Sequence, residues 1–186
     1  NSFRSETTRV RTSSELRMDD LLETCITEIA LEGLQGCNLK TLCSRLQKTE
    51  RFSQVDQYVK QVIWKILQRA YEIQLFDDSQ GQTPQNPITK FGYLTKDPRI
   101  EIKEEIPLTE ENEEKIKFVA KYEVRCSVLG LSGVDLDISD IQFCILELAG
   151  QKREQGVLQC DISRILSLDP RSTLYHLKRL ETSNLM

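Results

Sequence analysis

The chain has 186 residues, of which 39% are hydrophobic and 29% charged, with a net charge of −4 at pH 7. This length fits one large domain or two small ones. One histidine and six cysteines without a Cys-x-x-Cys pair argue against a zinc finger. The sequence contains no phosphate-binding glycine loop and no nucleophile motif, and no apolar run approaches the ~20 residues that a membrane span needs. These features argue against an enzyme, a bound metal or cofactor, a small-molecule substrate and a membrane protein.

The first half of the chain predicts a polar leader followed by a winged helix-turn-helix domain. Residues 1–17 contain almost nothing apolar and are predicted to be a disordered leader. Apolar residues at helical spacing then predict helices within residues 19–32, 39–46 and 55–70. A strand over 71–76, a turn-rich loop over 77–87 and a returning strand over 91–94 complete the pattern. Residues 18–96 are therefore predicted to form the first winged-helix domain.

The second half predicts a linker and a second domain of the same kind. Residues 97–114 are acidic, contain Pro98 and Pro107, and are predicted to be a linker. A strand over 115–120 and a short helix over 121–130 precede another three-helix pattern. Ser139 with Gln142 forms a capping box, and Asp169-Pro170 forms the start of the last helix. Residues 115–186 are thus predicted to form a second winged-helix domain whose wing would follow Met186. The predicted fold class is mainly α with small β wings, as tandem winged helix-turn-helix domains.

Charge is unevenly distributed between these segments. Between residues 39 and 70 there are seven basic residues against two acidic ones. Residues 97–117 carry eight acids and four bases, and residues 151–186 carry six bases and four acids. A net-acidic chain can still bind a polyanion through such basic patches, although ordinary solvated helix faces explain the same counts.

The last helix presents the strongest candidate for DNA contact, because the third helix of such a unit reads the major groove. At ~100° per residue, the predicted inward side holds Thr173, Leu174, Leu177 and Leu180, with His176 at its border. The outward side holds the candidate DNA-binding residues Arg171, Ser172, Tyr175, Lys178 and Arg179. Three cations, a hydroxyl and a phenol suit phosphate contacts and a guanine edge.

The third helix of the first domain carries a weaker signal. Its predicted outward side includes the candidate DNA-binding residues Gln57, Lys60, Gln61 and Lys65, together with Gln68. Glutamine can pair with adenine, and lysine suits phosphates. Trp64 falls on the same side, where a tryptophan is unusual in solvent. It is a candidate protein interface, expected to pack on the wing, the acidic linker or another subunit rather than to stack on a base.

Several segments together resemble a known family. Residues 28–36 (EIALEGLQG), 39–46 (LKTLCSRL) and 62–67 (VIWKIL) resemble the opening of the largest subunits of transcription factor IIIC (TFIIIC), the general factor of RNA polymerase III. Residues 141–150 (IQFCILELAG) and 169–180 (DPRSTLYHLKRL) resemble the B-block binding domain of the same subunits. Since family members are much longer, the resemblance implies an amino-terminal fragment.

The resemblance implies a nuclear DNA-binding segment that helps recognise the B-box promoter element inside transfer-RNA genes. The implied partners are double-stranded DNA and the other TFIIIC subunits, and no cofactor is implied. The alternative is a protein-interaction module within a transcription complex, since fold alone does not settle function. Phosphate-driven binding would weaken steeply with salt, whereas apolar docking would not.

Overall fold

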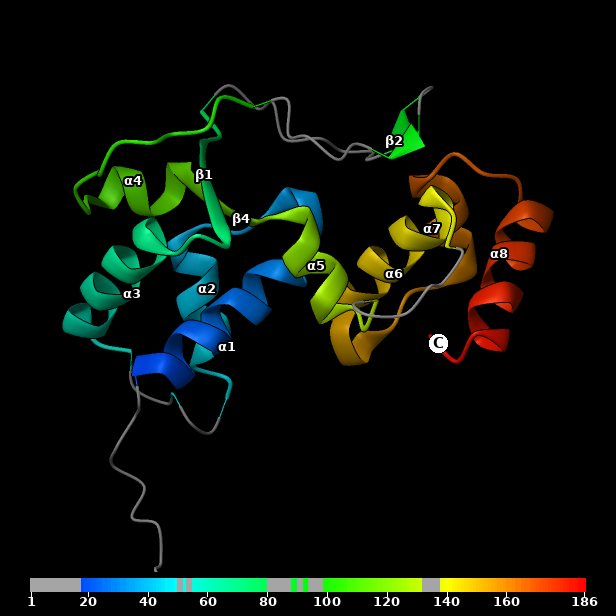
Figure 1. Cartoon of the computed structure of the whole chain (residues 1–186), viewed down its shortest axis with the longest axis horizontal. Helices are drawn as coiled ribbons and strands as arrows, with labels where there is room; N and C mark the ends of the chain where they lie inside the picture. The colour runs from blue at the N-terminus through cyan, green and yellow to red at the C-terminus, as the bar shows by residue number, and fades with distance from the viewer. Residues whose placement is uncertain are drawn as a thin grey trace, which may run out of the picture.

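The computed structural model describes residues 18–49, 52, 55–79, 88–89, 92–93, 99–131 and 138–186. The predicted leader over 1–17 and most of the predicted wing loop lie outside these residues. Two helical units lie side by side along the long axis of the molecule (Figure 1). Helices α3 and α8 lie at opposite ends of this axis.

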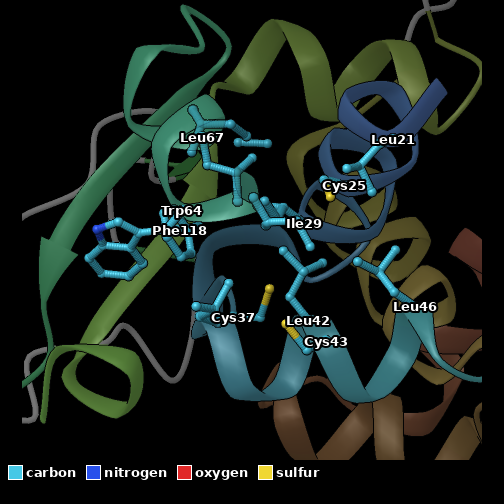
Figure 2. Packing of buried hydrophobic residues seen from close by; sticks show 14 of the residues in the cluster. Leu21, Cys25, Ile29, Cys37, Leu42, Cys43, Leu46, Trp64, Leu67 and Phe118 are labelled. Atoms are coloured by element: carbon cyan, nitrogen blue, oxygen red, sulfur yellow. The ribbon is translucent and has the colours of Figure 1, made fainter. Parts of the chain in front are cut away.

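The first unit contains three helices packed on a small sheet. They are α1 (Met18–Ala30), α2 (Leu39–Leu46) and α3 (Gln57–Arg69), with the 3-10 turn η1 (Gly33–Gln35) after α1. The side chains of Asn38 and Asp56 cap α2 and α3 by accepting hydrogen bonds from the backbone N–H groups of Thr41 and Val59. Apolar side chains of all three helices meet in one core, part of which is drawn in Figure 2.

The sheet of this unit joins strands that are far apart in the sequence. Strand β1 (Ile73–Asp77) pairs antiparallel with β4 (Ile116–Ala120), with Leu75 opposite Phe118. Cys37 forms an additional bridge to Phe118 on the other side of β4. The preceding residue, Gly36, has φ +59°, and a Cβ atom there would lie 2.4 Å from the carbonyl oxygen of Phe118. This close approach of two backbones therefore requires glycine.

The predicted wing pairing is wrong. We expected residues 91–94 to return beside the strand at 71–76, but β3 (Gly92–Tyr93) pairs with β2 (Ile88–Thr89) in a separate hairpin. Strand β4 is the better partner because its alternation places Ile116, Phe118 and Ala120 in the core, all at 4% exposure or less. A strand containing Gly92 offers less apolar surface for the same position.

The predicted linker and the predicted boundary at residue 115 also require correction. Residues 101–115, which we call the acidic strap, run along the first unit and end in the short helix α4 (Glu110–Lys115). Ile102, Ile106 and Leu108 of the strap pack against the first core. The strap and β4 thus belong to the first unit, because their apolar side chains complete its core. Among so many acidic residues, these three separated apolar residues do not form a pattern that predicts burial.

The second unit contains α6 (Asp140–Lys152), α7 (Gln159–Ile165) and α8 (Pro170–Thr182), with the 3-10 turn η3 (Arg153–Gln155) after α6. The predicted capping box is present, with the Ser139 side chain accepting from the Gln142 N–H and the Gln142 side chain accepting from the Ser139 N–H. Among residues 138–186 the structure contains helices and turns only. A tandem of two complete winged helices stays a prediction.

The two units are joined by polar contacts and by a connecting helix, α5 (Tyr122–Val128). Arg125 of α5 and Glu147 of α6 form an ion pair of 3.1 Å in which both side chains are almost fully buried. Arg153 pairs with Glu28 of α1 at 2.7 Å. The Gln151 amide donates to the backbone oxygen of Glu32. The Arg125–Glu147 pair thus joins α5 to α6, and the contacts of Arg153 and Gln151 join the second unit to the end of α1.

Candidate nucleic-acid interface

Hydrogen bonds in the first two turns of helix α8 cap the helix and join it to α7. Asp169 caps the helix by accepting hydrogen bonds from the N–H groups of Arg171 and Ser172, as the Asp-Pro sequence predicted. The fully buried Thr173 joins α7 through a 2.9 Å hydrogen bond between the hydroxyls of Ser163 and Thr173. The Gln159 side chain donates to the Pro170 backbone oxygen. These bonds set the orientation of α8 and decide which of its side chains face solvent.

The predicted outward side of α8 is largely exposed. Arg171, Tyr175, Lys178 and Arg179 are exposed, while Ser172 is half-buried. None of the three cations forms an ion pair with a described residue of the chain. The face therefore presents positive charge that the described part of the molecule leaves uncompensated.

Neither Leu174 nor His176 of α8 is fully buried. Leu174, predicted to face inward, is 43% exposed, because the buried side is centred on Thr173 and Leu180 and Leu174 lies about 100° away from it. His176 is half-buried beside the Tyr175 ring, and its Nδ1 atom has no hydrogen-bond partner. Burial, with the Arg179 charge, lowers the pKa of His176. The lowered pKa favours the neutral imidazole, so His176 adds little positive charge to this face.

Helix α3 presents a different surface. Gln57, Gln61 and Lys65 are exposed as predicted. Lys60 is half-buried and pairs with Glu113 of the acidic strap at 2.5 Å. One of the four predicted DNA-binding side chains of this helix is therefore already paired with the strap.

Trp64 is buried against its own chain. Its side chain is 2% exposed, its indole N–H donates to the Ile106 oxygen at 2.7 Å, and its ring meets Phe118 edge-on at 5.4 Å (Figure 2). Of the three packing partners considered, the acidic segment is the one found. The periodicity of α3 does not predict this contact of Trp64, because the strap covers a side of α3 that α1 and α2 leave open.

The strap also pairs with cations elsewhere on the first unit. Glu114 accepts from Lys40 at 2.7 Å, and Glu105 pairs with Arg69 at 3.0 Å. The hydrogen bond from Lys40 lowers the pKa of the Glu114 carboxyl. The Gln68 side chain, which accepts from the Ile106 N–H and donates to its oxygen, fixes the strap between these pairs. The acids of the strap thus neutralise basic residues on both α2 and α3.

The described residues provide no other chemical centre. They contain no group of three or more His, Cys, Asp or Glu side chains arranged to hold a metal ion. Among them, no helix combines the length and apolarity needed to cross a membrane. Burial raises the pKa of the Cys25 and Cys37 thiols to about 12, so neither is a thiolate at neutral pH. Cys25, Cys37, Cys43 and Cys144 are buried, Cys126 is half-buried and Cys160 is exposed.

Comparison with known proteins assigns the two units separately. The family described as general transcription factor 3C polypeptide 1, winged-helix domain, matches residues 18–132. The family described as B-block binding subunit of TFIIIC matches residues 139–186. The break between these matches falls after β4 and α5, in agreement with the contacts described above. No curated protein matches the chain.

The first match spans more than half of the chain and covers the strap, β4 and α5 as well as the three helices. Factors of this family act in nuclear transcription and are not enzymes. The chain therefore belongs to the winged-helix family of general transcription factor 3C polypeptide 1 and contains a B-block binding region of TFIIIC.

Proposed function

We propose that this chain helps TFIIIC to recognise the B-box promoter element of transfer-RNA genes, and that α8 makes the main DNA contact. The observation that carries the proposal is the exposed face of Arg171, Tyr175, Lys178 and Arg179, whose cations pair with no described carboxylate. Arginine can read guanine with two hydrogen bonds, and all three cations can contact phosphates. In this role the chain works in the nucleus, on double-stranded DNA and beside the other TFIIIC subunits.

The first unit would then contribute little to sequence reading. Three of the cations on α2 and α3, namely Lys40, Lys60 and Arg69, pair with the acidic strap. A phosphate would have to displace a carboxylate at each of them. The unit keeps exposed Lys65, Gln57 and Gln61, which suit weak contacts that do not depend on sequence.

A second role for the first unit follows from the same strap. A helix-turn-helix whose cations are internally paired is better suited to packing against protein than against DNA. We therefore propose that this unit positions α8 within the complex, with other TFIIIC subunits as its neighbours. The ion pair between its Glu28 and Arg153 of η3 supports this role, because the pair joins the second unit to α1.

The test is a fluorescence-anisotropy titration of the chain with a B-box duplex and a scrambled duplex of equal composition, over a series of salt concentrations. Three phosphate contacts would give log Kd a slope of about 2.7 against log salt. Replacing Arg171, Lys178 and Arg179 by alanine should lower both affinities and collapse the preference for the B-box, each lost base contact being worth about 1–3 kcal/mol.

The matched control replaces Lys60 and Lys65 by alanine. It should lower the affinity for both duplexes slightly, mainly through loss of exposed Lys65, and leave their ratio near its starting value. If the ratio collapses with this pair instead, the roles of the two units are reversed. Equal affinity of the parent chain for both duplexes would overturn the proposal that the chain itself reads the B-box.

A further inference from the structure

The exposed face of α8 contains a leucine that neither charge nor core packing explains. Leu174 is 43% exposed, whereas Thr173 and Leu180 on the same helix are fully buried. Single exposed leucines are common on protein surfaces, so exposure alone carries no meaning. The surroundings of Leu174, however, are those of a surface that meets DNA.

Leu174 lies among the free cations of the helix. Arg171 is three residues before it and Lys178 four residues after it, so both lie within about 60° of Leu174 around the helix axis. Tyr175, also exposed, follows it directly. Any duplex drawn to Arg171 and Lys178 through its phosphates would therefore bring an apolar side chain close to its groove.

The position of Leu174 along the helix also suits base contact. The residues near the start of a recognition helix are the ones that approach base edges in the major groove. Leu174 is in the second turn of α8, which begins at Pro170, and the Ser163–Thr173 hydrogen bond holds that turn against α7. The side chain is thus presented from a fixed backbone.

A leucine can make only apolar contacts, and the major groove offers one apolar group, the C5-methyl of thymine. We propose that Leu174 contacts a thymine methyl group and favours thymine at one position of the bound duplex. This inference rests on the proposed function, since it assumes that α8 faces the major groove.

The experiment removes single methyl groups from the DNA. Each thymine of the B-box duplex is replaced in turn by deoxyuridine, which retains every hydrogen bond of the base, and binding of the whole chain is titrated. One replacement should weaken binding about three- to fivefold, the effect of burying one methyl group. The other replacements should change the affinity little.

The chain variant Leu174→Ala closes a double-mutant cycle with that replacement. The variant should bind the thymine and deoxyuridine duplexes equally while still preferring the B-box over the scrambled duplex. Leu158→Ala, at an exposed leucine before α7 and outside this face, is the matched control and should keep the thymine preference. Thermal unfolding of both variants checks that folding is unchanged, as expected for exposed side chains.

The outcomes separate this inference from the proposed function. If the parent chain prefers the B-box but no deoxyuridine replacement matters, the thymine contact is wrong and the proposed function stands. If Leu174→Ala weakens binding to the thymine and deoxyuridine duplexes by the same factor, the methyl contact is wrong, and Leu174 contacts another part of the duplex. If the chain does not prefer the B-box, the proposed function fails first.

Discussion

Helices α3 and α8 each contain 13 residues, and each follows two other helices in its own unit. Both carry cations and polar side chains on the side that the sequence predicts to face outward. In α3 that side is partly covered by the acidic strap, which pairs with Lys60 and Arg69. In α8 the cations pair with no described residue. The comparison shows that basic residues on a helix indicate a DNA contact only where no carboxylate from a distant segment of the chain pairs with them.

The two aromatic residues that the sequence predicts on the outward sides, Trp64 and Tyr175, offer the largest test of this comparison. Trp64→Ala should destabilise the first unit by about 3–5 kcal/mol, because it removes a buried ring and one of the two side-chain donors to the Ile106 carbonyl. Tyr175→Ala, on exposed α8, should change the free energy of unfolding by no more than about 0.5 kcal/mol. Urea denaturation measures both. Similar stability of the two variants would place Trp64 at the surface after all.

Charge reversal should affect the two helices unequally. Arg171→Glu with Arg179→Glu should weaken B-box binding about a hundredfold, or about 2.7 kcal/mol, because attraction to phosphate becomes repulsion. Lys65→Glu with Arg69→Glu on α3 should cost less than about fivefold. Titration at one salt concentration gives both values, and circular dichroism verifies folding. An equal loss for both pairs would remove the distinction between α3 and α8.

Removing the charge of the strap should make α3 resemble α8. Replacing Glu105, Glu113 and Glu114 by glutamine frees Arg69, Lys60 and Lys40. Affinity for the scrambled duplex should then rise about three- to tenfold, with a steeper dependence on salt. A control that neutralises Asp19, Asp20 and Glu23 of α1 changes the net charge equally. If both variants gain affinity alike, net charge and not release of the paired cations is the cause.

The smallest effect concerns pH and belongs to α8. The pKa of His176 is lowered from 6.5 by burial, so the unfolded chain binds this proton more readily than the folded one. The contribution of neutral His176 to stability is complete above pH 6.5 and decreases as the pH falls through the lowered pKa. His176→Gln should therefore lose less stability than the parent between pH 7.5 and 5.5 in thermal unfolding. An identical pH profile for both proteins would show that His176 does not contribute.

Local signals in the sequence predict much of the second unit. Ser139 with Gln142 and Asp169 with Pro170 mark helix starts through backbone hydrogen bonds that neighbouring residues supply. Helical periodicity also places Arg171, Tyr175, Lys178 and Arg179 at the surface, because a helix bound on one side leaves the opposite side free.

The errors concern contacts between distant segments. The coverage of Trp64 depends on Ile106, and the pairing of Leu75 depends on Phe118. Neither partner is encoded in the periodicity of the segment it covers, and the acidic residues around Ile106 suggest solvent. Leu174 shows a milder form of the error, because a stripe of leucines does not reveal where its buried centre lies.

The pairing of β1 with β4 also bears on synthesis of the protein. Strand Ile73–Asp77 leaves the ribosome roughly 40 residues before Ile116–Ala120, a delay of about 2–8 s at ordinary translation rates. During this time Leu75 and Phe76 belong to an open strand edge, which can pair with another nascent chain. Expression of a piece ending at residue 96 would make this state permanent. Aggregation of such a piece would then reflect a missing strand, even if all three helices of the unit were intact.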